Sequence, residues 1–164
     1  MEANNANAFY LLAGWYDTGD KGVSQDFAKA NELYLKGGEL GCAVAYYNLA
    51  VSYINGVGIE VIKKKAKHYW ELAAINGEIN ARHDLGCVEL DAGNHHRAMQ
   101  HFILSANAGY KKSLDPVKRG FIDGIVTKNE YENTLRAYQE RYNEMKSEDR
   151  NKFAEALRQR AEGM

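Results

Sequence analysis

The chain has 164 residues, 45% hydrophobic and 26% charged, which suffices for one folded domain with a buried core. Its formal net charge of −1 gives no long-range field of one sign, so neither nucleic acid nor a membrane is expected as a partner. No apolar run approaches the roughly 20 residues that span a bilayer, and the opening MEANNANAFY lacks the features of a signal peptide, so we expect a cytoplasmic or nuclear protein that is not secreted.

The predicted elements of the first two thirds of the chain are copies of one unit. Four residue types recur 37 positions apart, pairing Ala8 with Ala45, Leu12 with Leu49, Tyr16 with Tyr53 and Gly19 with Gly56. After that turn the offset is 36, and between the second and third units it falls to 32 across the same turn. Length changes confined to one place indicate a surface turn between packed elements. The units cover residues 8–41, 45–77 and 81–109.

Within each unit the apolar residues recur every three or four positions, as in Ala45, Leu49 and Tyr53. This spacing predicts amphipathic helices. Each unit is therefore expected to form a helix A, a glycine-bearing turn, a helix B and a second turn that ends in glycine. The expected fold class is all-α.

The turn of the second unit, NGVG at 55–58, precedes three lysines and could suggest a phosphate-binding loop. The equivalent turns are TGDKG at 18–22 and DAG at 91–93, so this position in the repeat can lose a glycine and change length. Because a phosphate site could not tolerate that, we expect the glycines to supply positive φ where helix A ends. Asp26 is expected to cap the following helix, and Ile62 leaves the next unit without this cap.

The recurring pattern, A-x3-L-[GA]-x2-Y-x2-G-x-G-[VI]-x5-K-A-x3-W-x2-AA-x2-G, closely resembles the Sel-one-like repeat (SLR) family, relatives of the tetratricopeptide repeats. Residues 45–77 match it best, 8–41 form a second copy, and 81–109 form a third copy that has Glu89 where the family has an aromatic residue. The resemblance implies a right-handed α-α superhelix, or solenoid, that binds partners or assembles complexes and has no chemistry of its own.

Three segments also resemble a group of algal proteins in which similar repeats often follow an N-terminal RING-type zinc finger. They are KANELYLKGGELG, KHYWELAAINGEINARHDLG and GIVTKNEYENTLRAYQ. No such finger occurs in this sequence. If the chain is a fragment of one of these proteins, the resemblance implies the substrate-recognition part of a larger ubiquitin-ligase-like protein.

The C-terminal third is expected to hold a degenerate fourth repeat, residues 113–145, with Asp115 as the cap and Pro116 at the first helical position. Thr127 and Glu130 form a capping-box pattern that predicts the start of the next helix.

A separate C-terminal capping helix is expected over 147–163, starting at Ser147. Its narrow apolar stripe consists of Phe153, Leu157 and Ala161. A coiled-coil dimer is the alternative use of this segment.

No cofactor, metal ligand set or catalytic residue is predicted, and the chain is not expected to be an enzyme. Cys42 and Cys87 form no CxxC pair and are expected to be buried. The sequence contains no HExxH, no paired carboxylate and no GxSxG motif, so the histidines are expected at the surface. They are His68, His83, His95, His96 and His101.

By analogy with tetratricopeptide repeats, helix A residues outside the repeat core would line the concave face of the solenoid. The residues expected to bind a partner are Tyr10, Tyr47, Asn48, Val51, Asn55, His83, Asp84 and Arg119. Aromatic rings beside amides are typical of a peptide-binding groove, although tyrosines at these positions could instead pack on their own neighbours.

The predicted function is that of a protein- or peptide-binding scaffold or adaptor. The alternative is a structural, self-associating protein, a weak homo-oligomer through its C-terminal helices, whose groove is filled by its own C-terminal helix or by a second copy.

Overall fold

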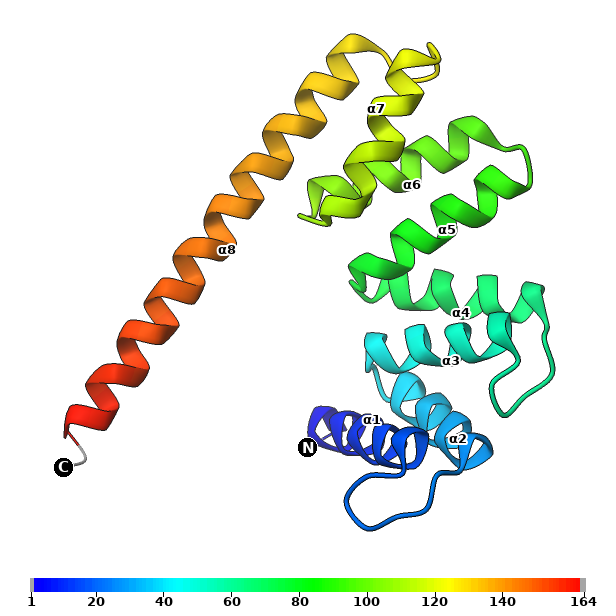
Figure 1. Ribbon diagram of the computed structural model, residues 1–164, viewed down its shortest axis with the longest axis vertical. Coiled ribbons are helices and arrows are strands. Elements are labelled where there is room, and N and C mark those ends of the chain that lie inside the picture. Colours follow the sequence, from blue (N-terminus) through cyan, green and yellow to red (C-terminus); the bar gives the residue numbers. More distant parts are fainter. Residues whose placement is uncertain (1, 163–164) are drawn as a thin grey trace. The chain divides into compact units, whose positions relative to one another are not determined.

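The computed structural model describes residues 2–162, and in that range it contains α-helices, one short 3₁₀ helix and no strand (Figure 1). The predicted all-α class is therefore confirmed. Contacts group the chain into two compact units, Met1–Ala98 and Met99–Met164.

The first unit consists of successive helices that pack on one another: α1 on α2, α2 on α3, α3 on α4 and α4 on α5 (Figure 1). Their bounds are α1 Glu2–Thr18, α2 Phe27–Glu39, α3 Ala43–Asn55, α4 Lys63–Ile75 and α5 Ile79–Asp91. Helix α6, His95–Asn107, follows and lies mostly in the second unit. This is the alternation of helix A and helix B that the repeat predicts.

Small residues let neighbouring helices approach closely. A Cβ on Gly37 of α2 would lie 3.2 Å from the Ala45 Cβ of α3 and 3.2 Å from the Ala6 carbonyl oxygen of α1. Ala45 itself is completely buried. The helix B aromatics of this unit, Tyr34 and Trp70, are buried in the same core. The core of the first unit is therefore built from the repeat positions.

One backbone hydrogen bond closes the turn of every repeat. The N–H at the start of helix B donates to a carbonyl oxygen near the end of helix A: Asp26 to Tyr16 at 2.8 Å, Ile62 to Tyr53 at 3.1 Å and Asn94 to Glu89 at 2.8 Å. The same bond spans turns of different length, so the turn can shorten while the helix pair keeps its register.

The turn chemistry agrees with the prediction. Gly19, Gly56 and Gly93 have φ values of 73°, 71° and 78°, in the left-handed region that favours glycine. The Asp26 side chain accepts a hydrogen bond from the Lys29 N–H at 2.9 Å, whereas Ile62 supplies no such cap. These glycines end helix A, as the sequence predicts.

The second unit continues with the 3₁₀ helix η1, Lys111–Ser113, then α7, Leu114–Ile122, and α8, Lys128–Glu162. The predicted cap at Asp115 is wrong: α7 begins at Leu114, with Ser113 as its N-cap, so Pro116 is the third helical residue. The 3₁₀ helix runs directly into α7 and moves its start forward. Proline is tolerated there because the first four N–H groups of a helix have no partner within the helix.

The break predicted at Ser147 does not occur, because α8 is one continuous helix of 35 residues. Ser147 and the acidic residues after it suit a helix start, but no glycine or proline lies nearby to stop the preceding helix. The side chains of Leu157 and Ala161 and all of residue 163 lie outside the described residues. The capping box is confirmed, since the Thr127 N–H donates to Glu130 Oε2 at 2.8 Å.

One cysteine prediction is wrong. Cys42 is buried, but Cys87 on α5 is exposed. Cys87 shares its repeat position with Val51, which is only half-buried, whereas the neighbouring Leu85 and Gly86 are buried. Although Cys87 is exposed, its neighbours partly desolvate the thiol, and this desolvation, with the nearby Asp84 and Asp91, raises its pKa and keeps it protonated near neutral pH.

Candidate functional site

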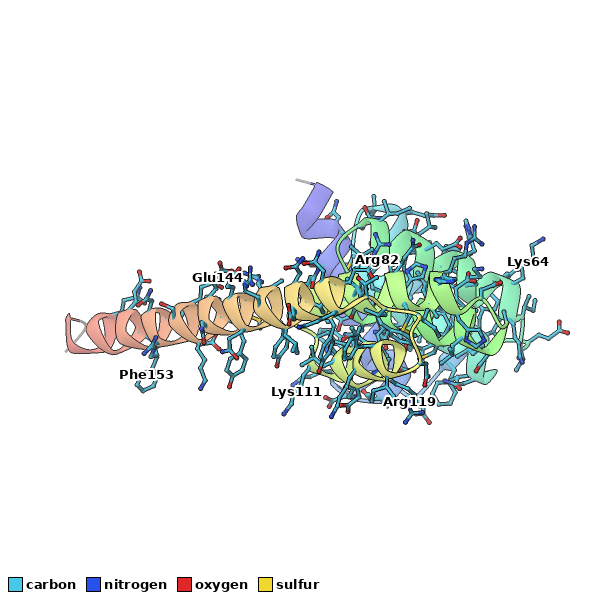
Figure 2. All side chains as sticks on the ribbon, turned by 90° about the horizontal axis from the view of Figure 1, so that it is seen from above. Lys64, Arg82, Lys111, Arg119, Glu144 and Phe153 are labelled. Atoms are coloured by element: carbon cyan, nitrogen blue, oxygen red, sulfur yellow. The ribbon has the colours of Figure 1, made fainter. Side chains whose placement is uncertain are left out.

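The predicted binding residues of the first unit lie on α1, α3 and α5, which are the A helices of the three repeats. We call them the A-helix face: Tyr10 on α1, Tyr47, Asn48, Val51 and Asn55 on α3, and His83 and Asp84 on α5. Asn55 is exposed and the others are half-buried. Arg119 lies on α7 in the second unit and is exposed (Figure 2).

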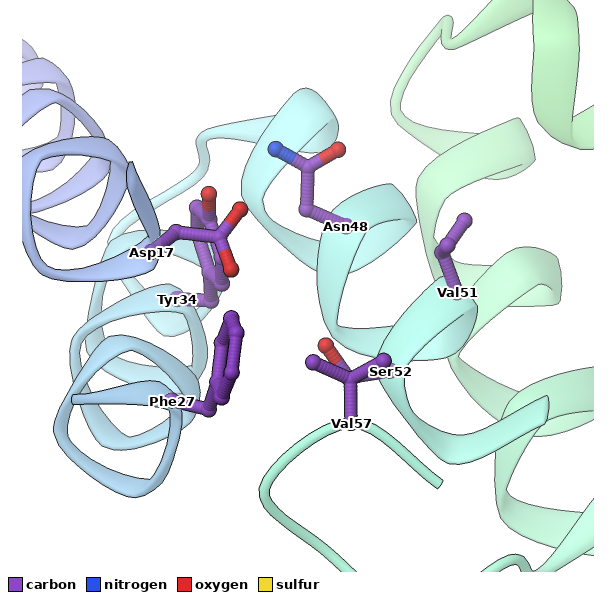
Figure 3. A pocket seen from close by; sticks show the side chains of 7 residues that line it. All are labelled: Asp17, Phe27, Tyr34, Asn48, Val51, Ser52 and Val57. Atoms are coloured by element: carbon purple, nitrogen blue, oxygen red, sulfur yellow. The ribbon is translucent and has the colours of Figure 1, made fainter. Parts of the chain in front are cut away.

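A pocket of about 370 Å³ opens in the first unit between α1, α2, α3 and the turn after α3. Figure 3 shows Asp17, Tyr34 and Phe27 on one side of it and Asn48, Val51, Ser52 and Val57 on the other. Two predicted residues, Asn48 and Val51, therefore line the same pocket. Sequence reasoning missed the other five.

The pocket depends on the NGVG turn, which docks on the preceding repeat. The Asn31 side-chain amide donates to the Val57 carbonyl oxygen at 2.8 Å. Gly58 has φ 65°, and a Cβ there would lie 2.6 Å from the Phe27 carbonyl carbon and 2.9 Å from the Ala28 nitrogen. The glycine thus allows the turn to reach α2 and holds Val57 as one wall of the pocket.

Tyr34 supplies a buried hydroxyl at the polar end of the pocket. Burial, together with the neighbouring Asp17 carboxylate, raises the pKa of Tyr34 to about 12, and the Asn48 amide opposes this shift. The hydroxyl therefore stays protonated near neutral pH, and it lies near the Asp17 carboxylate and the Asn48 amide at the polar end of the pocket. None of the salt bridges in the described part of the chain involves Asp17.

Tyrosine packing accounts for several rings of the first unit. The Tyr10 ring lies 6.2 Å from the Tyr34 ring, so this predicted binding residue also packs beside the pocket. Tyr69 stacks between Tyr46 and Tyr53, with ring centroids 5.8 Å and 5.6 Å away. The Lys65 amino group lies 5.2 Å from the Tyr53 ring centroid, which adds a cation–π contact. None of the residues predicted to bind a partner belongs to this stack.

Glu89 takes the place of an aromatic residue in the third repeat and is buried. Its carboxylate accepts a hydrogen bond from Lys67 Nζ at 2.6 Å and one from Asn94 Nδ2 at 2.7 Å. These contacts, that of Lys67 first, hold the pKa of the Glu89 carboxyl below its usual value. The charged side chain therefore ties the short third turn to α4, where the other repeats use a tyrosine.

Two further classes of site were sought in the part of the chain that the structure describes. It contains no group of three or more His, Cys, Asp and Glu side chains arranged to hold a metal ion. None of its helices combines the length and the hydropathy needed to cross a bilayer.

Comparison with known proteins identifies the repeats. Residues 6–42, 43–78 and 83–110 match the Sel1 repeat. A Sel1 repeat protein from Oxalobacter formigenes superposes with a TM-score of 0.73 at 26% identity, over 85% of this chain and 59% of that one. No match was found among curated proteins.

A protective antigen present in uropathogenic Escherichia coli strains, which displays an SLR fold, superposes with a TM-score of 0.68 at 19% identity. This superposition covers 83% of this chain and 31% of the antigen. The chain thus spans less than two thirds of either structure, and both support the solenoid fold that the repeat predicts.

Proposed function

Because the chain belongs to the Sel1 repeat family, whose members are generally protein-interaction scaffolds, we propose that it is a non-catalytic adaptor that binds a protein or peptide through the A-helix face. The proposal includes a location in the cytoplasm or nucleus. It also takes the family's lack of catalytic chemistry to hold for this chain.

The observation that carries the proposal is the pocket that Asn48 and Val51 of this face line, where polar groups lie beside apolar walls. Pockets of this composition, mostly apolar with a few placed polar groups, are typical of binding sites. Tyr47 on α3 and His83 on α5 occupy the same repeat position as Tyr10 on α1, so the three side chains follow the row of A helices. Since aromatic anchors contribute much of the affinity at such surfaces, we expect a segment of the partner to follow this row.

The test is capture of partners from a lysate of the source organism, with the wild type compared with a Tyr47→Ala, His83→Ala double variant of equal melting temperature. We expect a partner that the wild type retains and the variant loses. Asn55→Arg serves as a second variant, because Asn55 is exposed and its replacement should not disturb folding. Identical partners for all three proteins would contradict the proposal.

Self-association is the second candidate, and exposed apolar residues on α8 favour it. Leu135, Tyr142 and Phe153 are 39%, 38% and 68% exposed, and Figure 2 shows Phe153 projecting from the helix. Sedimentation equilibrium of the full chain and of a Leu135→Glu, Tyr142→Glu variant tests it. A concentration-dependent dimer that the variant loses would support self-association, and a monomer at all concentrations would exclude it.

A further inference from the structure

We propose that the pocket between the first two repeats binds a positively charged side chain, that of an arginine or a lysine in an extended peptide. This inference rests on the proposed function and names the chemistry that the A-helix face selects.

The walls of the pocket fit the aliphatic stem of such a side chain. Phe27 and Val57 lie on opposite sides of the pocket, and Val51 is a further apolar residue of its lining (Figure 3). A volume of about 370 Å³ is near the small end of the range for ligand pockets, which suits one side chain rather than a large cofactor. Long basic side chains bury their methylene groups along apolar surface while the charged head reaches a polar partner.

The polar end of the pocket carries one negative charge. The Asp17 carboxylate lies near the Tyr34 hydroxyl, a neutral donor, and its two oxygens have acceptor capacity for further hydrogen bonds. A guanidinium or ammonium group would supply a charge-assisted hydrogen bond there. An acidic side chain would be repelled, and an apolar one would take water from the carboxylate without replacing its hydrogen bonds.

No basic group of the described chain occupies this place. Lys29, at the start of α2, pairs with Glu32 at 3.1 Å, and the Gln25 side chain reaches the Asp17 backbone carbonyl at 2.8 Å rather than its carboxylate. The described lining residues include no lysine, arginine or histidine. The pocket thus offers an acceptor for a cation that must come from another molecule.

The experiment is an NMR titration of the full, ¹⁵N-labelled chain with N-acetyl-arginine amide and with N-acetyl-citrulline amide. Citrulline matches arginine in shape but has no charge. We expect arginine to shift the signals of the pocket residues and to bind at least tenfold more tightly than citrulline. Asp17→Asn should abolish this preference, and Asp149→Asn, which removes an exposed charge on α8, should keep it.

Equal binding of the two probes, shifts confined to residues outside the pocket, or a preference that survives Asp17→Asn would overturn the inference. The Asp17→Asn change keeps the side-chain shape, and equal melting temperatures of the variants would show that folding is intact. If a partner binds the A-helix face while arginine has no effect, only this inference fails. If arginine binds the pocket while no partner depends on Tyr47 and His83, only the proposed function fails.

Discussion

The Lys67 amino group and the buried Glu89 carboxylate lie 2.6 Å apart, joining helix α4 of the second repeat to helix α5 of the third. Tyr16 and Tyr53 hold the equivalent positions in the first two repeats. The third repeat has thus replaced an aromatic contact with an ion pair, and its turn is four residues shorter than that of the second.

Lys67→Met is expected to destabilise the protein by about 2 kcal/mol at neutral pH, since it leaves a buried carboxylate with fewer hydrogen bonds. The pKa of Glu89 is lowered in the folded state, so its contribution to stability is present above the unfolded pKa. That contribution is lost as pH falls through the lowered folded pKa. Urea unfolding of both proteins at pH 7 and pH 3 should show the difference shrinking in acid, and a difference unchanged by pH would contradict the account.

Gly58→Ala is expected to destabilise the protein more than Gly22→Ala, its equivalent in the first repeat. Both glycines have positive φ, 65° and 82°, so both changes strain the backbone by about 1 kcal/mol or more. Only the Cβ at position 58 would collide with α2, because nothing lies within 4 Å of one at position 22. Chemical denaturation measures the difference, and equal losses would show that the turn does not dock on Phe27.

Trp70→Ala is expected to cost about 3–5 kcal/mol, because it removes a large buried side chain from the core and leaves a cavity. Phe153→Ala removes an aromatic ring that is 68% exposed and should change stability by less than about 0.5 kcal/mol. Calorimetry of the two variants compares these losses. Similar melting temperatures would mean that the repeat aromatic is not a core residue.

Tyr34→Phe is expected to cost about 1 kcal/mol at neutral pH, because it removes a buried hydroxyl that interacts with Asp17 and Asn48. The pKa of Tyr34 is raised to about 12 in the folded state, so the stability linked to its neutral form is present below the unfolded pKa. It is lost as pH rises through the folded pKa. Between pH 8 and pH 11, denaturation should show a larger loss of stability for the wild type than for the variant. Equal losses would contradict an interaction of the hydroxyl.

Local patterns were sufficient to predict the repeat helices and their turns. The spacing of Leu49 and Tyr53 predicts a helix, and Gly56 predicts its end, since both depend on residues close in the sequence. The start of α7 and the interior of α8 show where such patterns conflict. Thr127 is an unambiguous cap, whereas Asp115 and Ser147 suit both a helix start and a helix interior.

The pocket was predicted only in part because it is assembled by contacts between repeats. Asn48 and Val51 could be found from their repeat position. Asp17 had no such signal, since it contributes through its proximity to the Tyr34 hydroxyl on another helix. The pairing of Asn31 with the Val57 carbonyl, which fixes the remaining wall, likewise joins residues 26 positions apart in the sequence.

The most direct test of the central claim is site-specific photo-crosslinking with a benzophenone side chain at Asn55, on the A-helix face, or at Glu71, an exposed residue of α4. Both proteins are irradiated with the same lysate, and the adducts are identified by mass spectrometry. The account predicts a protein adduct at position 55 that is absent at position 71 and disappears in the Tyr47→Ala, His83→Ala background. The same adducts at both positions, or none at position 55, would contradict it.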